Sequence, residues 1–208
     1  MLVEINKKVN IKNTLTQEVI PFDSSNKTIS FTAFCDEGEI KAYWIGEKSG
    51  HPVRFGTATY CKSIQRDELM ELSKPLLKRL NYTGVCEVEF LLDPRDRKYK
   101  LIEINARTWL WVGLARACGV DYAQIIYNYL NNIPINYPSK YIIGLKWINY
   151  LTDTFVSIQM LFKKEISITE YIKSLKGKKI RAVFSVSDSI PWVMLLILSF
   201  YLARKRII

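Results

Sequence analysis

The chain has 208 residues, with 30 Lys and Arg against 20 Asp and Glu, which gives a formal net charge of +10 at pH 7. Hydrophobic residues make up 49% and aromatic residues 12%, so the composition excludes a disordered chain and suits one domain with an appendage. His51 is the single histidine, which excludes a zinc site built on several histidines. The positive charge indicates an anionic partner, with nucleotide phosphate, acidic lipid and nucleic acid all open.

The cysteines and the first residues indicate the compartment. The four cysteines are widely spaced, with no C-x-x-C pair, so the sequence predicts buried free thiols rather than a metal or redox pair. The opening segment MLVEINKKVNIKN is charged and lacks the apolar stretch of a signal peptide. We therefore expect a cytoplasmic protein in a reducing environment.

The first elements predicted along the chain are strands. The segment Thr14 to Ile20 (TLTQEVI) is strand-like and ends at Pro21. Residues 28–35 and 39–45 flank a compact turn that ends in glycine, which predicts a hairpin. A polar loop, GEKSGHPVRFG, then leads to a short strand over residues 57–60.

Helices and a second hairpin follow. Residues 67–80 have leucines at helical spacing, which predicts a helix that Pro75 kinks or restarts. Its expected apolar face consists of Leu69, Leu72, Leu76 and Leu80. A second hairpin is expected over residues 85–92 and 100–106, joined by DPRDRK, and two helices over residues 109–118 and 122–131. Gly119 should end the first of these helices and Asp121 should cap the second.

The second hairpin gathers acidic side chains. Residues equally distant from the turn near Asp96 should lie opposite each other, which pairs Glu89 with Glu103 and Glu87 with Asn105. Because side chains alternate along a strand, one face should carry Glu87, Glu89, Glu103, Asn105 and Arg107.

These carboxylates repel one another, so a positive group should lie beside them. Mg²⁺ prefers carboxylate and amide oxygens and commonly takes one or two carboxylates together with substrate phosphates. The alternative is a solvated acidic face paired with Lys and Arg. The strict two-residue spacing of Glu, Asn and Arg in EINAR, beside the opposing Glu89, favours the metal.

The segment GVCEVEFLLDPRDRKYKLIEINAR resembles the metal-binding hairpin of the ATP-grasp superfamily. It is most similar to the carboxylate–amine ligase branch, which contains D-aspartate ligase-like proteins and is related to biotin carboxylase and carbamoyl-phosphate synthetase. The resemblance implies that Glu89, Glu103 and Asn105 are metal ligands. It places Arg107 near the substrate and the transferred phosphate, as a catalytic residue, and gives Glu87 no fixed role.

Residues upstream are similar to the same family. TQEVIPF resembles the strand that binds adenine, which implies an adenine pocket lined by Gln17, Glu18, Val19 and Ile20. The loop with Lys48 and Arg54 resembles the segment that brings cationic side chains towards the phosphates or the acyl substrate. An ordinary solvated basic loop would show the same residues. His51, in a Gly-His-Pro turn, favours a conformational role.

The resemblance implies an α+β fold, an ATP-grasp C-terminal lobe made of an antiparallel sheet with packed helices, plus a helical C-terminal extension. We expect a partial ATP-grasp domain over residues 1–132, the extension over 133–189 and an apolar and basic tail helix over 190–208. The family's glycine-rich lobe has no counterpart in this sequence. We therefore expect a separate N-terminal lobe or a partner chain to complete the site.

The implied activity is ATP-dependent ligation of a small-molecule carboxylate to an amine through an acylphosphate. The implied cofactors are ATP and two Mg²⁺ ions, with Mn²⁺ as an alternative ion. The competing interpretation is a non-catalytic remnant that acts as a membrane-associated interaction module. A nucleic-acid partner is not expected, because no aromatic–basic RNA motif occurs and the hairpin face is acidic.

The tail offers two alternatives. Residues 190–203 form an apolar run of fourteen, followed by Arg204, Lys205 and Arg206. As a helix this run reaches about 21 Å, short of a bilayer core of about 30 Å. Trp192, Tyr201 and the basic cluster suit an anchor that lies on an anionic membrane surface, at the inner face of the membrane. A helix docked on the protein's own core is the other alternative.

Overall fold

A computed structural model describes residues 17–21, 27–48, 58–164 and 166–206. Within them the strands form one seven-stranded sheet in the order β5-β4-β1-β2-β3-β6-β7. Neighbouring strands are antiparallel except β6 and β7, which are parallel. The strands are β1 (Thr28–Asp36), β2 (Glu39–Lys48), β3 (Tyr60–Ser63), β4 (Gly84–Leu92), β5 (Tyr99–Asn105), β6 (Lys146–Ile148) and β7 (Lys179–Arg181).

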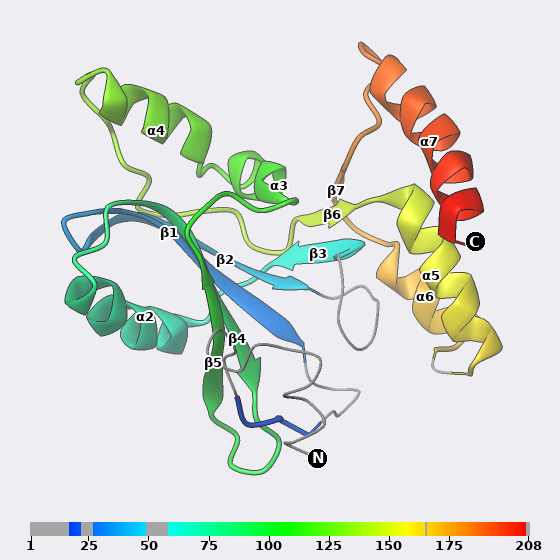
Figure 1. Ribbon diagram of the computed structural model, residues 1–208, viewed down its shortest axis with the longest axis horizontal. Coiled ribbons are helices and arrows are strands. Elements are labelled where there is room, and N and C mark those ends of the chain that lie inside the picture. Colours follow the sequence, from blue (N-terminus) through cyan, green and yellow to red (C-terminus); the bar gives the residue numbers. More distant parts are fainter. Residues whose placement is uncertain (1–16, 22–26, 49–57, 165, 207–208) are drawn as a thin grey trace, which may run out of the picture.

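The described helices are α2 (Asp67–Arg79), α3 (Val112–Ala117), α4 (Tyr122–Leu130), α5 (Tyr150–Phe162), α6 (Ile168–Ser174) and α7 (Ile190–Arg206). Figure 1 shows α2 on one side of the sheet and α3 and α4 on the other, with α5, α6 and α7 gathered beyond β3 and β6. The α+β architecture predicted from the sequence is confirmed.

Two apolar cores lie on the two faces of the sheet. Alternate residues of β1, including Phe31 and Ala33, pack towards α2, where Leu69 and Leu77 complete the core. On the other face, Phe34 and Trp44 pack with the aromatic residues around α3 and α4. This alternation follows from the period of two in a strand. The residues between those of the α2 core, including Ser30 and Thr32 of β1 and Glu87 and Glu89 of β4, therefore lie on the α3–α4 side.

Most predicted elements are confirmed. Both hairpins form, with β1 pairing β2 and β4 pairing β5. The carboxylate of Asp121 caps α4 by accepting a hydrogen bond from the Gln124 amide at 3.2 Å. The predicted helix α2 forms, but it runs without interruption through Pro75, so the restart considered at that residue does not occur. All four cysteines are buried and free, as expected.

Other local predictions were wrong in whole or in part. The strand expected over residues 57–60 begins at Tyr60 and runs to Ser63, where it pairs with β2 and β6. Of the four leucines predicted to form the apolar face of α2, Leu69 is buried and Leu76 packs against the core, whereas Leu72 and Leu80 are exposed. Ser73 and Leu77 are buried as well. The stripe that faces the sheet is therefore rotated towards Ser73, because the docking angle of the helix and not the leucine spacing sets its buried side.

The strand expected over residues 14–20 is also corrected where it is described. Residues 17–21 have no regular secondary structure, and Val19 is 83% exposed. The segment contacts β5 through a side chain, since Gln17 Nε2 donates to the Ile102 carbonyl at 3.0 Å. A side-chain contact of this kind does not build a ladder, so alternating sequence alone did not make a strand here.

The sheet continues past residue 132. Strands β6 and β7 come from the region expected to be a helical extension, and β6 pairs with β3. Trp147 in β6 is part of the core around Trp44. The tail forms α7 as a helix of 17 residues. Among the described residues, no helix combines the length and apolar character needed to cross a bilayer.

Candidate functional site

The β4–β5 hairpin has the register that the sequence predicts. Glu89 lies opposite Glu103, and Glu87 lies opposite Asn105. The register shifts just beyond this point, between Glu89 and Phe90, so the bulge leaves the acidic pairs intact. Cys86 and Val88 pack in the α2 core, which leaves Glu87 and Glu89 on the α3–α4 side of the sheet.

The side-chain amide of Asn105 joins the three carboxylates. Its Nδ2 lies 3.3 Å from Glu87 Oε2, 3.3 Å from Glu89 Oε1 and 2.9 Å from Glu103 Oε1. On its other side, Arg107 Nη2 donates to Asn105 Oδ1 at 3.2 Å. The partial positive charge of the Asn105 amide hydrogens therefore lies between the three carboxylates and offsets part of their repulsion.

Lys48 supplies a full positive charge at the same point. Its Nζ lies 2.5 Å from Glu89 Oε1 and 3.7 Å from Glu87 Oε1. Because β1 lies between β2 and β4, the Lys48 side chain reaches across β1 from the end of β2. The residue predicted to face phosphate is therefore part of the acidic cluster, which we define as Glu87, Glu89, Glu103, Asn105 and Lys48.

Glu87 is the innermost acidic group, with a relative exposure of 2%. Burial raises the pKa of Glu87, Lys48 opposes this change, and the charge of Glu89 adds to it. The hydroxyl of Ser30 donates to Glu87 Oε1 at 2.7 Å and holds the carboxylate in place. These contacts assign Glu87 a supporting position, behind the more exposed Glu103.

The donor set fits Mg²⁺. The described residues contain no group of three or more His, Cys, Asp or Glu side chains arranged around one metal position. Glu89, Glu103 and Asn105 offer two carboxylates and one amide oxygen, the kind of oxygen donors that Mg²⁺ accepts alongside phosphate oxygens. The Asn105 oxygen now faces Arg107, so the amide would have to turn for that oxygen to join the two carboxylates. Lys48 and the Asn105 amide hydrogens now compensate the same negative charge that a cation would.

The segment predicted to bind adenine lies beside the hairpin (Figure 1). Glu18 Oε1 accepts from Arg95 Nη1 at 2.7 Å, and Arg95 also pairs with the buried Asp93 at 2.6 Å. Gln17 contacts β5, whereas Val19 faces outward. The structure brings neither Val19 nor Ile20 into a described pocket. Arg54 and His51 lie outside the described residues.

Sequence reasoning missed Ser30 and the Arg95–Asp93 pair. The Arg95 guanidinium lowers the pKa of the Asp93 carboxyl to about 2. The pair fixes the hairpin turn, because Asp93 also accepts from the Arg95 backbone amide at 3.0 Å. A signal for Ser30 existed: in TISFTAF, Ser30 and Thr32 are polar residues two apart in an otherwise apolar strand, which marks a polar position on one sheet face.

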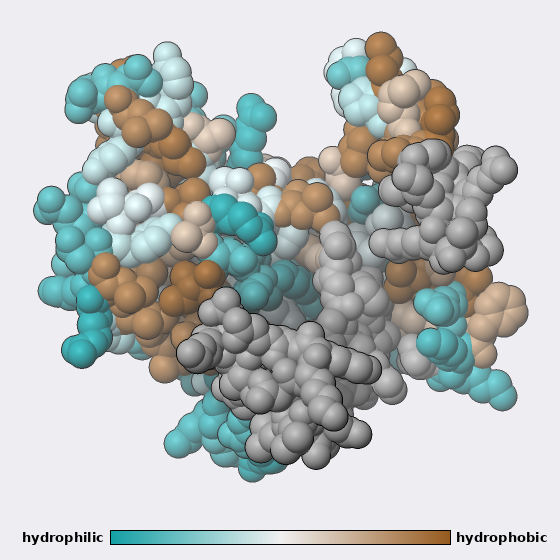
Figure 2. All heavy atoms as spheres, viewed as in Figure 1, coloured by the Kyte–Doolittle hydropathy of each residue, from teal (hydrophilic) through white to brown (hydrophobic). Residues whose placement is uncertain are grey.

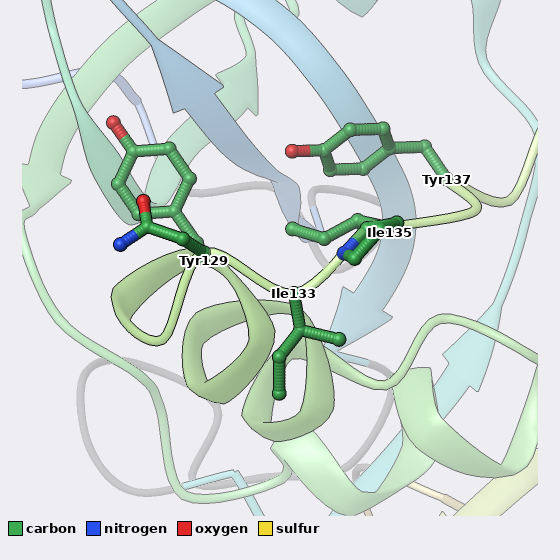
Figure 3. A pocket seen from close by; sticks show the side chains of 6 residues that line it. Tyr129, Ile133, Ile135 and Tyr137 are labelled. Carbon is green, nitrogen blue, oxygen red and sulfur yellow. The ribbon is translucent and has the colours of Figure 1, made fainter.

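A pocket of about 510 Å³ lies away from the acidic cluster, after the end of α4. Its lining consists of Tyr129, Asn132, Ile133, Pro134, Ile135 and Tyr137. Figure 3 shows the Tyr129 and Tyr137 rings on either side of Ile135. The Tyr129 hydroxyl donates to Asp36 at 2.7 Å, which places the pocket at the opposite end of β1 from Ser30. No charged group lines it, so it adds nothing to the chemistry of the hairpin.

Comparisons with known proteins give matches in sequence and in fold. Residues 42–128 match the family described as carbamoyl-phosphate synthase L chain, ATP binding domain. A D-aspartate ligase from Enterococcus faecium (strain Aus0004) is 29% identical over 97 residues, which cover 45% of this chain. The chain spans 23% of the length of that ligase.

Solved structures share the fold. Pyruvate carboxylase from Rhizobium etli aligns with a TM-score of 0.50 and 18% identity, over 62% of this chain and 13% of that one. Biotin carboxylase from Campylobacter jejuni, in a complex with β-γ-ATP, aligns with a TM-score of 0.50 and 15% identity, over 61% of this chain and 29% of that one. At these identities the likeness concerns the fold alone.

Proposed function

We propose that the chain carries part of an ATP-grasp domain and provides the metal-binding half of an ATP-dependent carboxylate–amine ligase. The sequence likeness to D-aspartate ligase, 29% identity over 97 residues, supports this branch of the superfamily. In the proposed reaction a carboxylate attacks the γ-phosphate of ATP and releases ADP. An amine then displaces phosphate from the acylphosphate and forms an amide.

One observation carries the proposal: the register of β4 and β5 gathers Glu89, Glu103 and Asn105 around one point. A structural hairpin gains nothing from opposed glutamates, because like charges directly opposite each other are destabilising. The burial of Glu87 and Glu89 increases the free-energy cost of this repulsion. Such an arrangement is expected where a cation and an anionic ligand bind together.

Each residue has a distinct role in the proposal. Glu89, Glu103 and the Asn105 amide oxygen would hold Mg²⁺, which when bound neutralises the triphosphate and the charge that develops during transfer. Lys48, released from Glu89, would turn its ammonium towards the phosphates. Arg107, which now donates to Asn105 and to the Thr108 carbonyl, would bind the acylphosphate oxygens. Gln17 to Ile20 would bind adenine from the hairpin side.

The test is calorimetric titration of ATP into the chain with and without Mg²⁺, together with assays for amide formation. Glu103→Gln and Asn105→Ala should each weaken Mg²⁺-dependent ATP binding by at least about tenfold, the scale on which even supporting residues of metal sites act. Both side chains are at least partly exposed, so the fold should survive.

Asp96→Asn is the matched control, because Asp96 is an acidic residue of the same hairpin that pairs with Lys100 in the turn. It should leave ATP binding unchanged. If Glu103→Gln and Asn105→Ala bind ATP as the unchanged chain does, with the same dependence on Mg²⁺, the proposed site is wrong. Intact Mg²⁺-dependent binding without turnover, in the presence of an N-terminal lobe, would favour a non-catalytic remnant.

A further inference from the structure

The three C-terminal helices expose rows of apolar side chains. On α5, the rings of Phe155 and Phe162 and the side chain of Ile158 are 67%, 84% and 45% exposed. Their spacing of three and four residues puts them on one side of the helix. The other side of α5 carries Asp153, Ser157 and Met160, which are buried against the protein. The exposed row is therefore an outward face and not a gap in packing.

Helices α6 and α7 also expose apolar side chains. On α6, Ile168 and Ile172 are four residues apart and more than half exposed. On α7 the exposed row consists of Ile190, Val193, Met194, Ile197 and Leu198. Between these positions, Trp192 packs edge-on against Phe184 at 5.7 Å, and Leu195 and Leu196 are half-buried. Figure 2 shows hydrophobic side chains along α7.

Apolar exposure is concentrated in this part of the molecule. Of 22 large hydrophobic residues exposed within the described part of the chain, 12 lie between Tyr150 and Leu198. Scattered exposed apolar residues are normal, but exposed rows on three consecutive helices mark an interaction surface. We name the apolar residues of α5, α6 and α7 given above the C-terminal apolar face.

The same region carries most of the positive charge. Residues 150–208 contain ten Lys and Arg against four Asp and Glu, so 59 residues hold +6 of the net charge of +10. Lys163 and Lys164 follow the exposed row of α5, and Lys173, Lys176 and Lys178 lie in or just after α6. These five side chains are all exposed. Apolar rows bordered by lysines are complementary to a surface that is anionic outside and apolar beneath.

We infer that the C-terminal apolar face is a binding site for an anionic lipid bilayer. The exposed rows of α5, α6 and α7 would enter the boundary between headgroups and acyl chains, and the lysines would contact lipid phosphates. Protein–protein interfaces are depleted of lysine, whereas lysines border these apolar rows, which favours a lipid surface over a protein partner. The inference is independent of the proposed ligase site, because no residue of the acidic cluster takes part.

The experiment is co-sedimentation of the full chain with vesicles of phosphatidylcholine alone and of phosphatidylcholine mixed with phosphatidylglycerol. The chain should bind the mixed vesicles and lose binding as salt is raised. Phe155→Ser with Phe162→Ser should weaken this binding by at least about tenfold, since each ring loses a burial worth well over tenfold in affinity. Lys173→Gln with Lys176→Gln and Lys178→Gln should also weaken it, by about fivefold for each lysine that lies at the surface.

Two controls separate the face from general stickiness. Leu110→Ser with Leu130→Ser removes two exposed apolar residues near α3 and α4, and Lys41→Gln with Lys74→Gln removes exposed charges elsewhere. Both control variants should bind the mixed vesicles as the unchanged chain does. Circular dichroism should give the same spectrum for all variants, because every substituted side chain is exposed.

Two outcomes would overturn the inference. One is equal sedimentation of the unchanged chain and the Phe155 and Phe162 variant with the mixed vesicles. The other is a chain that ignores vesicles but self-associates in light scattering, with dissociation caused by the same two substitutions. That second result would assign the C-terminal apolar face to contact between copies of the protein.

Discussion

The ammonium of Lys48 lies in front of two carboxylates, 2.5 Å from Glu89 Oε1 and 3.7 Å from Glu87 Oε1. Its side chain is only 20% exposed, so solvent screens these interactions less than those of a surface ion pair. Ser30 and Asn105 complete the contacts of Glu87. At the scale of single residues, Lys48 compensates the negative charge of the acidic cluster, a role that a metal ion would take over under the proposed function.

This role predicts the effect of Lys48→Met. Without divalent ions the substitution should lower the free energy of unfolding by about 1–3 kcal/mol, because it leaves partly buried carboxylates without their cation. Millimolar Mg²⁺ should restore more stability to this variant than to the unchanged chain, which urea denaturation with and without Mg²⁺ measures.

Lys27→Met is the control, because Lys27 pairs with Glu47 at 2.9 Å but is 47% exposed. Its loss should cost well under about 1 kcal/mol and should not depend on Mg²⁺. Equal stability of Lys48→Met and the unchanged chain in the absence of metal would contradict the assigned role.

At the scale of elements, β2 connects the aromatic core to the acidic cluster. Trp44, Gly46 and Lys48 occupy every second position of this strand and therefore lie on one face. The Trp44 ring packs edge-on against Trp111 at 5.2 Å and stacks parallel to Trp109 at 6.4 Å. A Cβ on Gly46 would lie 2.3 Å from Trp111 Cζ3 and 2.3 Å from Trp44 Cη2. Only glycine allows both rings to cross the strand here.

Gly46→Ala should therefore lower the free energy of unfolding by about 1–3 kcal/mol or more, because two buried rings must move. It should also weaken Mg²⁺-dependent ATP binding, since Lys48 lies two residues further along.

Gly113→Ala, in the short helix α3, is the opposite case, because a Cβ on Gly113 would meet no other atom within 4 Å. It should be neutral or stabilise by up to about 1 kcal/mol. A stable Gly46→Ala variant would show that the aromatic rings adapt freely.

At the scale of the whole molecule, the sheet crosses the expected boundary at residue 132. Strand β6 pairs with β3, and Ser63 is bonded to the following segment through the Leu145 carbonyl at 2.9 Å. Trp147 and Ile148 are buried at 4% and 1% exposure. Residues 146–148 thus share the sheet with the hairpins, and Trp147 shares the aromatic core around Trp44.

A chain that ends at residue 132 should consequently fail to unfold as one sharp transition, because β3 loses its neighbour and the core around Trp44 opens to water. A chain that ends at Ser189 keeps all seven strands and should retain a urea midpoint close to that of the full chain. Denaturation followed by tryptophan fluorescence measures both. A cooperative transition in the 132-residue chain would move the domain boundary back to the position expected from the sequence.

The sequence by itself determined the two hairpins, α2, the cap of α4 and the pairing of Glu89 with Glu103 and Glu87 with Asn105. These features depend on local geometry, since distances from a turn and the alternation of side chains fix a register without knowledge of the rest of the fold. The tertiary structure decided what local pattern does not contain. Strand order placed β1 between β2 and β4, so that Lys48 reaches Glu89 across about 10 Å of sheet. Docking of α2 selected Ser73 over Leu72 for the core, and the packing of α5, α6 and α7 left their apolar rows outside, because burial depends on which neighbours arrive from distant parts of the chain.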